Sequence, residues 1–451
     1  MAMTRRVDWA ALAGAGLAAP STAHVSLAWL VRTCLFFSFL AAFLQYEVTS
    51  GLALYMSLAL FALCGMLVLG GPRRGERVQN ILSGGGLLFA AILFGEVVSY
   101  TSGDTYSVAY GLLFAGVFLC ARLIVQEIGV PNIVRAYSQA AILTVCTVLV
   151  SGRWTLLAAE GSRFTGGSRA HPNLLGFILA GFFPTLVWRA LEEKVRWRKW
   201  VLILLSLANF DFIFLTGSRG SLVAVFAAGG ALLLRAAAGG WLKKIRIRHF
   251  QIIVFLILIP LAMAYLLEHN RIGRLGGFLN DYLSLSSSQR GLKSGLSGRT
   301  GIWQIAFRIL RTQDRWLFGF GYRAGDRLVG TIDNGYIVLL FESGLIAGLM
   351  IFGSMLRVFF LLWHVSRPRE NNAWTRYYMV LWCMMIVYFL NNISTRYLFS
   401  FGSPFSLCIL CLMVASRQEL VGGGMGSRVM QKVKPPPRAA TAALAWDRSG
   451  R

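Results

Sequence analysis

The sequence predicts an all-α, polytopic integral membrane protein with about 12 transmembrane helices. Three observations predict this class: 56% of the 451 residues are hydrophobic, only 14% are charged, and long apolar runs recur from residue 26 to residue 416. Soluble domains carry roughly 25% charged residues. A membrane-spanning helix needs roughly 20 apolar residues to cross a hydrocarbon core of about 30 Å. The apolar excess is therefore spread over many candidate spans.

The predicted transmembrane domain covers residues 26–416, with one sizeable extramembrane loop, 269–334, between the ninth and tenth spans. The tenth span is long, and its glycines predict a tilt or a break at Gly344, Gly348 or Gly353. Residues 1–25 are predicted as a cytoplasmic N-terminus without a cleavage site, and residues 417–451 as a basic, disordered cytoplasmic tail. The predicted spans are 26–46, 52–70, 81–99, 106–121, 136–152, 173–189, 200–216, 219–235, 250–268, 335–363, 376–391 and 396–416.

The distribution of positive charge predicts the orientation, because cytoplasmic loops carry an excess of Lys and Arg. Placing both termini in the cytoplasm puts most of the 44 Lys and Arg residues inside, including those of the predicted inner connection 122–135. We therefore expect a polytopic inner-membrane protein in a lipid bilayer. The net charge of +25 then fits an anionic inner leaflet, and no soluble basic domain is found to bind nucleic acid.

Three outer loops depart from this charge rule. Arginines suit phosphate or pyrophosphate, because the guanidinium stays ionised and its planar fork matches phosphate oxygens. Arg219 lies in a tight turn between two spans, where snorkelling to lipid headgroups explains it equally well. The outer basic residues singled out are Arg163, Arg169 and His171 in loop 153–172, Arg219 in turn 216–220, and Arg299 in loop 269–334.

The long outer loop also contains a predicted amphipathic helix. Apolar residues recur at helical spacing from Ile302 to Leu310. Such a helix is expected to lie on the membrane surface, with Arg308, Arg311 and Arg315 contacting lipid headgroups.

Polar residues stand at or near the outer ends of two spans. Asp333 precedes the tenth span, and Glu342 lies two turns further on, where we expect it to face the same cavity as Arg219 and Arg299. Asp333 fits a helix N-cap equally well. His171 and Asn173 begin the sixth span; a lone histidine there is more often a hydrogen-bond partner than a catalyst, and Asn173 is expected to be a cap.

Several other chemistries find no support in the sequence. It contains no phosphate-binding loop of the GxxxxGK[ST] type, no GxSxG elbow and no HExxH motif. No His, Cys and carboxylate cluster has metal-ligand spacing. The seven cysteines, including the CxxC pair Cys408 and Cys411, lie mostly inside apolar runs and are interpreted as packing residues.

A series of short motifs occurs in order over roughly residues 160–350. They are Arg163–Gly166, His171-Pro-Asn173, Thr216-Gly-Ser-Arg-Gly220, Ser297-Gly-Arg299 followed by Trp303, the LFGFG stretch 317–321, Asp333-Asn-Gly-Tyr336, and Glu342–Gly348. In order and spacing, this series resembles the O-antigen ligase and Wzy polymerase superfamily.

The resemblance implies a GT-C-like membrane glycosyltransferase that uses sugars carried on undecaprenyl pyrophosphate at the periplasmic face. It implies no metal and no cofactor, with Arg219 and Arg299 neutralising the leaving pyrophosphate. The amphipathic helix would cover the opening that faces the lipid. Substrate-binding residues are then expected to be Arg163, Arg169, His171, Asn173, Ser218, Asn334 and Tyr336.

One departure from the resemblance favours the polymerase branch. Ligases of the superfamily typically carry a histidine just before the Asn-x-Tyr stretch, whereas this sequence has Asp333. We expect Asp333, or as second choice Glu342, to accept the proton of the attacking hydroxyl. The donor and the acceptor are then both lipid-linked oligosaccharides, and a chain-length regulator is a further candidate partner.

Two alternative functions remain open at this point. One is the ligase that moves the glycan onto lipid A-core. The other is a transporter or flippase of lipid-linked oligosaccharide, which would be expected to show inverted repeats and broken helices near the midplane.

Overall fold

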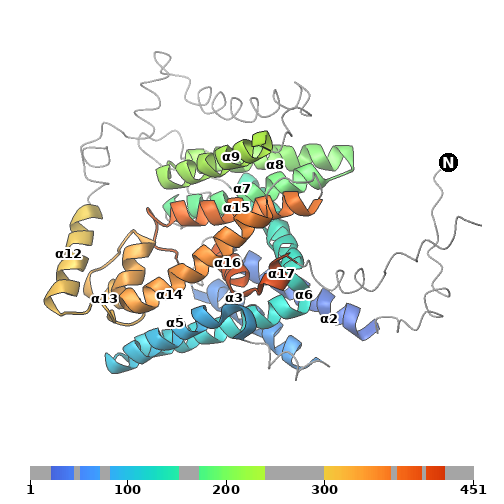
Figure 1. Cartoon of the computed structure of the whole chain (residues 1–451). Coiled ribbons are helices and arrows are strands. Elements are labelled where there is room, and N and C mark those ends of the chain that lie inside the picture. The colour runs from blue at the N-terminus through green and yellow to red at the C-terminus, as the bar shows by residue number, and fades with distance from the viewer. Residues whose placement is uncertain are drawn as a thin grey trace, which may run out of the picture.

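The computed structural model describes residues 22–44, 51–71, 82–151, 172–238, 299–366, 373–398 and 403–421, and the regular structure of these residues is entirely helical (Figure 1). The helices are α2 (Thr22–Leu44), α3 (Gly51–Leu69), α5 (Leu82–Thr101), α6 (Thr105–Ser151), α7 (Pro172–Glu192), α8 (Arg196–Leu215), α9 (Arg219–Ala238), α12 (Arg299–Thr312), α13 (Ala324–Leu328), α14 (Gly335–Val365), α15 (Ala373–Asn391), α16 (Pro404–Val414) and α17 (Arg417–Val421).

Four of these helices are long and apolar enough to cross a membrane: Leu52–Leu69, Thr105–Val150, Pro172–Glu192 and Gly335–Val365. The predicted class, an all-α membrane protein, is therefore confirmed for the described residues. The number of spans stays a prediction. Several predicted segments lie outside the described residues: 1–21 of the N-terminus, the ninth span 250–268, residues 269–298 of the long loop, and residues 422–451 of the tail.

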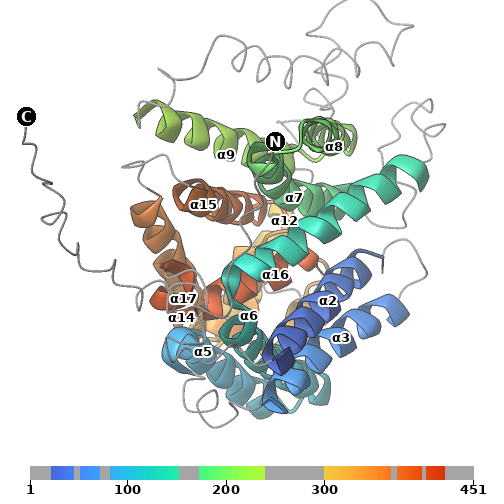
Figure 2. The same cartoon turned by 90° about the vertical axis from the view of Figure 1, so that its right-hand side faces the viewer.

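The helices pack into one bundle with a continuous apolar core. In both views α8 and α9 lie along one side, α3 and α5 along the other, and α16 in the middle (Figures 1 and 2). Phe405 of α16 anchors the core: its ring centroid lies 5.3 Å from that of Phe177 in α7 and 5.5 Å from that of Tyr388 in α15. Burying such rings supplies most of the packing energy of a core like this one.

Helix α6 includes the residues that were predicted to form an inner connection, so that prediction is wrong. Residues 122–135 are not a surface loop, because the helix runs on through them with one break at Gly129, where φ is 72°. Arg122 is 1% exposed and Ile124 is fully buried. The segment is apolar enough to pack inside the bundle, and the break lets the chain change direction without leaving it.

Helix α16 corrects the last predicted span. It has 11 residues, Pro404–Val414, all of them buried by the rest of the protein. A helix of this length covers only about half of a bilayer core. The predicted span 396–416 was too long at its start because residues 391–396 form a polar turn and α16 begins only at Pro404.

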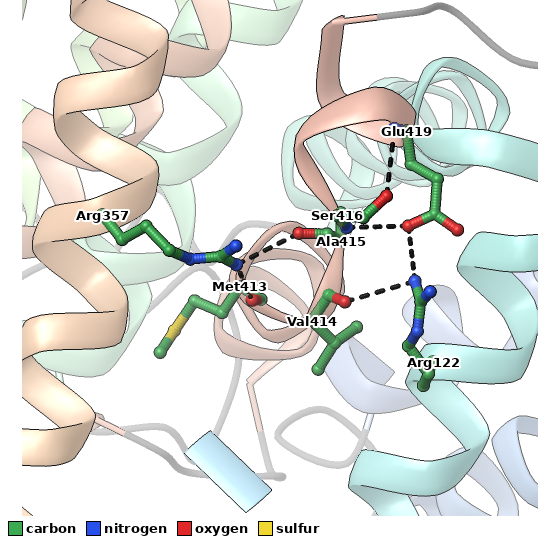
Figure 3. Close-up of polar contacts among 7 residues, drawn as sticks. All are labelled: Arg122, Arg357, Met413, Val414, Ala415, Ser416 and Glu419. Carbon is green, nitrogen blue, oxygen red and sulfur yellow. Dashed lines mark hydrogen bonds and ion pairs between the residues drawn. The ribbon is translucent and has the colours of Figure 1, made fainter. Parts of the chain in front are cut away.

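Two arginines cap the end of α16, as Figure 3 shows. Arg122 of α6 donates to the Val414 carbonyl at 3.3 Å and pairs with Glu419. Arg357 of α14 donates to the carbonyls of Met413 and Ala415 at 3.0 and 3.1 Å. The last carbonyls of a helix have no partner within the helix and carry partial negative charge, and the two arginines satisfy both requirements.

The first residues of the predicted disordered tail are ordered in the structure. Arg417–Val421 form α17, which begins with reciprocal bonds between Ser416 and Glu419. This is the capping box that the pattern Ser-x-x-Glu predicts. Leu420 is 1% exposed, so the short helix is held against the bundle.

We expect Arg122→Leu to lower the free energy of unfolding by roughly 1–3 kcal/mol, the cost of leaving buried polar groups without a partner. The α16 carbonyl would lose a charged donor, and Glu419, which is 23% exposed, would keep some access to water. Thermal unfolding of the purified protein measures the change. Arg417→Ala removes the same charge from an exposed position on α17 and is expected to leave the midpoint unchanged; equal midpoints for both variants would contradict the capping role.

Helix α14 is broken at Gly344, one of the three predicted positions. Gly344 has φ 69° and ψ −178°, and the loop 316–321 fills the break. Phe320 and Gly321 donate to the carbonyls of Phe341 and Glu342, and Leu345 donates to the carbonyl of Trp316, at 2.8–3.0 Å. The LFGFG stretch therefore supplies hydrogen bonds that the helix itself lacks at this point.

We expect Gly344→Ala to destabilise the fold by about 1–3 kcal/mol or more, because its backbone region is essentially restricted to glycine. An added Cβ would also collide with the carbonyl oxygen of Leu317. Gly348→Ala is the matched control, since a Cβ there would meet only Leu339, at 3.9 Å. Thermal midpoints in detergent compare the two. A Gly344→Ala protein as stable as Gly348→Ala would show that the break is not required.

Helix α12 confirms the predicted amphipathic helix. Ala306 and Leu310 are buried against a small apolar cluster that includes Phe320, Ile332 and Phe341. One apolar face thus packs on the protein, and the expected position on the membrane surface stays a prediction. Arg308, Arg311 and Arg315 are exposed, and their contact with lipid headgroups stays a prediction.

Candidate functional site

A polar turn between α15 and α16, residues 391–396, organises the candidate site. Its sequence is Asn-Asn-Ile-Ser-Thr-Arg. Asn391 and Asn392 are fully buried although they are polar. Buried amides are retained where they make specific hydrogen bonds, and here the turn bonds to the first residues of three other helices.

The start of α14 is held by this turn. The backbone N–H of Gly335 donates to the Asn392 carbonyl at 2.8 Å, and the side-chain amide of Asn334 donates to the Ile393 carbonyl at 3.0 Å. The Asn334 side-chain oxygen accepts the N–H groups of Tyr336 and Ile337. Asn334 is therefore the N-cap of α14. The alternative interpretation of Asp333 as that cap is wrong.

The start of α9 approaches the same turn. Gly220 packs so closely on Ser394 that an added Cβ would collide with its hydroxyl, and Ser221 donates to the Asn391 side-chain oxygen at 3.3 Å. These contacts bring Arg219, the first residue of α9, to the turn. Arg219 is half-buried and engaged in contacts within the protein.

The start of α12 completes the arrangement. Arg299, the first residue of α12, donates to the Ser394 carbonyl at 3.1 Å. Its Nε lies 3.4 Å from an oxygen of Asp333, and the two side chains are 21% and 36% exposed. Because Asn334 takes the capping role, the Asp333 carboxylate is left to pair with Arg299. Residues 95 positions apart in the chain are thus in direct contact.

Three predicted substrate-binding residues turn out to be held by the protein itself. Ser218 is 3% exposed, and its hydroxyl lies 2.9 Å from that of Ser221. The Tyr336 hydroxyl donates to the Phe389 carbonyl at 2.9 Å. Asn334 uses both ends of its amide within the protein. These residues position the arginines and Asp333.

The other predicted residues divide into two groups. Arg163, Arg169 and His171 lie outside the described residues. Asn173 lies inside the first turn of α7, which begins at Pro172, and so does not precede the helix as a cap. Gly176 lies one turn further along α7 and packs against Ser218. A Cβ added at Gly176 would lie only 2.6 Å from the Cβ of Ser218. The start of α7 is therefore close to the start of α9.

Glu342 is not among the contacts of the arginines at the turn. It lies beside the break in α14 and lines a separate pocket with Tyr110, Arg323 and Arg396. The backbone N–H groups of Arg323 and Gly325 donate to its carboxylate. The expectation that it faces the same cavity as Arg219 and Arg299 is replaced by this neighbouring pocket, which Arg396 connects to the turn.

A second network attaches α13 to the α5–α6 connection. Arg327 pairs with Asp104 at 2.7 Å, and the Ser107 hydroxyl lies 2.6 Å from both the Asp104 carboxylate and the Tyr322 carbonyl. The hydrogen bond from Ser107 and, less strongly, the charge of Arg327 hold the pKa of Asp104 below its ordinary value. Asp104 therefore contributes stability above its unfolded-state pKa, which is lost as the pH falls through the lower folded value.

The sequence reasoning missed the turn 391–396 and the residues Arg323, Asp326 and Arg396. Two apolar runs are separated by a short polar segment, and this interruption was a signal from which the turn could have been predicted. Its polar residues are Asn391, Asn392, Ser394, Thr395 and Arg396. The turn was not recognised because the last predicted span began at residue 396.

No group of three or more His, Cys, Asp and Glu side chains in the described part of the chain is arranged to hold a metal ion. No protein-family model matches this sequence, and no curated protein matches it. The resemblance given above therefore depends on the short motifs alone. The geometry adds an independent observation: residues of three of those motifs meet at one turn.

Proposed function

We propose that this protein is a polysaccharide polymerase at the periplasmic face of the bacterial inner membrane. It transfers a glycan from undecaprenyl pyrophosphate onto the terminal sugar of a lipid-linked repeat unit, for an O-antigen, a capsule or an exopolysaccharide. The observation that carries the proposal is the meeting of the starts of α9, α12 and α14 at the turn 391–396, where Arg299 pairs with Asp333 and Arg219 is the first residue of α9.

The two arginines supply the charge that a leaving pyrophosphate needs. Developing negative charge is the main electrostatic demand of such a transfer, and preorganised cations meet it without rearrangement. Arg299 is held by the Ser394 carbonyl but remains 21% exposed. A partly exposed ion pair such as that of Arg299 with Asp333 contributes only about 0–1 kcal/mol. A pyrophosphate can therefore replace the carboxylate on Arg299 at little cost.

Asp333 is the proton acceptor in this proposal. The acceptor hydroxyl oxygen forms a bond to the anomeric carbon of the donor, and the bond from that carbon to the pyrophosphate oxygen breaks. Undecaprenyl pyrophosphate leaves with the electron pair, and the hydroxyl proton passes to Asp333. Two observations support this role: Asp333 is 36% exposed next to Arg299, and it has no capping function that would occupy it.

The proposed setting has both termini in the cytoplasm, about 12 spans of a GT-C-like domain and the site facing the periplasm. The apolar helices and the charge distribution of the sequence support it. In this setting α12 shields the site from the lipid, with its buried face on the protein and its exposed arginines outward.

The broken helix α14 does not favour a transporter. Transporters use unwound backbone to coordinate ions or substrates. Here the carbonyls of Phe341 and Glu342 accept hydrogen bonds from the loop 316–321, so the break is closed by the protein itself. The ligase remains the neighbouring alternative, and the experiment below separates it from the polymerase.

Deletion of the gene in the native bacterium, followed by gel analysis of the surface glycans, tests the proposal. A lost polymerase leaves single repeat units, on lipid A-core or on the lipid carrier, in place of a ladder. A lost ligase leaves lipid A-core without any repeat and polymer accumulated on the carrier. An unchanged ladder in the deletion strain would refute both activities.

A further inference from the structure

A pocket next to the turn 391–396 has no role in the chemistry described so far. It lies between α6, α13 and α14, and Arg396 of the turn forms part of its wall. Its cavity volume of about 50 Å³ is enough for roughly four water molecules. The pocket can therefore enclose one edge of a ligand, while the remainder of that ligand lies outside.

The polar wall of the pocket is built by ion pairs that fix its groups in place. Asp326 bridges two arginines: one oxygen lies 2.7 Å from Arg323 and the other 2.5 Å from Arg396. Glu342 is held by the backbone of Arg323 and Gly325. The Nε–H of Arg323 is buried and has no acceptor among the described residues. An unsatisfied buried donor of this kind costs free energy until an acceptor reaches it.

The apolar wall combines aliphatic side chains with three aromatic ones, Tyr110, Phe114 and Tyr322. Tyr110 lies under the Arg323 guanidinium, with the ring centroid 5.5 Å from its central carbon. Tyr322 is fixed at both ends, because its hydroxyl donates to the Ile92 carbonyl and its N–H donates to Ser99. Rigid aromatic faces beside convergent polar groups are typical of sites for amphipathic small molecules.

The charges of the pocket select the class of ligand. Arg323 and Arg396 lie in the same wall as Asp326 and Glu342, so the wall offers both hydrogen-bond donors and acceptors. A hydroxyl both donates and accepts, and it matches such a wall. A pyrophosphate would meet two carboxylates. Arg299, at the start of α12, is partly exposed and faces the single carboxylate of Asp333 in its printed ion pair, so pyrophosphate is assigned to that place instead.

We propose that this pocket binds the terminal sugar of the acceptor by one hydroxyl-bearing edge, a role that rests on the proposed glycosyl transfer. The turn 391–396 connects the two sites: Ser394 contacts Arg299, and Arg396, two residues later, forms the pocket wall. Two extended residues span at most roughly 7 Å, a distance comparable to the length of one sugar ring. The acceptor is thus held beside the leaving group and Asp333.

Saturation-transfer NMR on the purified full-length protein in detergent tests the pocket. The probes are the methyl glycosides of glucose, galactose, mannose, rhamnose, N-acetylglucosamine and N-acetylgalactosamine. We expect transfer to at least one of them. Arg323→Gln and Tyr110→Leu are expected to weaken that binding about tenfold or more, the loss of a hydrogen bond to a charged group or of an aromatic face.

Two further variants keep the result interpretable. Asp326→Asn preserves the shape of the wall and removes one charge, and it is expected to weaken sugar binding even if Tyr110→Leu does not fold. Arg327→Gln changes the same short helix but faces Asp104, so sugar binding is expected to be unchanged. If no probe receives saturation, or if the Arg323→Gln protein binds as wild type does, the pocket is not a sugar site.

Inorganic pyrophosphate, followed by phosphorus NMR line width in the same samples, separates this inference from the proposed function. We expect Arg299→Ala to lose pyrophosphate binding and the pocket variants to keep it. If the wild-type protein does not bind pyrophosphate, the proposed glycosyl transfer is contradicted. The sugar-binding measurement still tests the pocket in that case. If the Arg323→Gln protein also loses pyrophosphate binding, the assignment of the sugar to the pocket and of pyrophosphate to Arg299 is wrong.

Discussion

Arg299→Ala is expected to reduce glycan transfer by about 10²- to 10³-fold, the usual cost of removing one preorganised group that stabilises developing negative charge. Arg299 is partly exposed, held by the Ser394 carbonyl and next to Asp333. Its guanidinium can therefore bind a pyrophosphate without moving the helix. Initial rates of chain elongation in membranes, with lipid-linked repeat units as both substrates, measure the effect.

The control for this prediction lies on the same helix. Arg308→Ala removes an exposed guanidinium about two and a half turns away in α12 and is expected to change the rate less than twofold, because surface substitutions away from a site have small effects. Arg299→Lys keeps the charge but loses the planar fork, so an intermediate rate is expected. If Arg299→Ala elongates chains at the wild-type rate, the pyrophosphate role of this residue is wrong.

Asp333→Asn is expected to lower the turnover number by about 10²- to 10⁴-fold, the contribution typical of a general base. The substitution is nearly isosteric, and Asn334 rather than Asp333 caps α14. The thermal midpoint is therefore expected to stay at the wild-type value while the rate falls. Full activity of Asp333→Asn would exclude the base role and leave Asp333 as a partner of Arg299.

A double-mutant comparison separates a base from a residue that only positions Arg299. If Asp333 acts solely through Arg299, the protein with both Arg299→Ala and Asp333→Asn is as slow as Arg299→Ala alone. If Asp333 accepts the proton, the double variant is slower still, and the loss in Asp333→Asn appears in the turnover number with little change in the KM for the donor.

The candidate site was partly predictable from the sequence. Arg219 and Arg299 were singled out because arginines on the outer side oppose the usual charge distribution, and Asp333 because it precedes an apolar run. Their contact was not predictable, since nothing local places residue 299 beside residue 394. Asn334 and Asp333 are equally good caps by residue type. The bonds from Asn334 to Ile393 and from Gly335 to Asn392 decide between them.

The sequence by itself determined that the described residues form apolar helices, and it limited the break in α14 to three glycines. Helix length and hydropathy are local properties, and a glycine is readily tolerated where the backbone must take a positive φ, as Gly344 does. Only the tertiary structure decided which helix ends meet. It buried Arg122 against the end of α16, reduced the last predicted span to 11 residues and gathered the starts of α9, α12 and α14 on one polar turn. These outcomes depend on hydrogen bonds between residues far apart in the chain, because a buried carbonyl or amide takes whichever partner the packing brings to it.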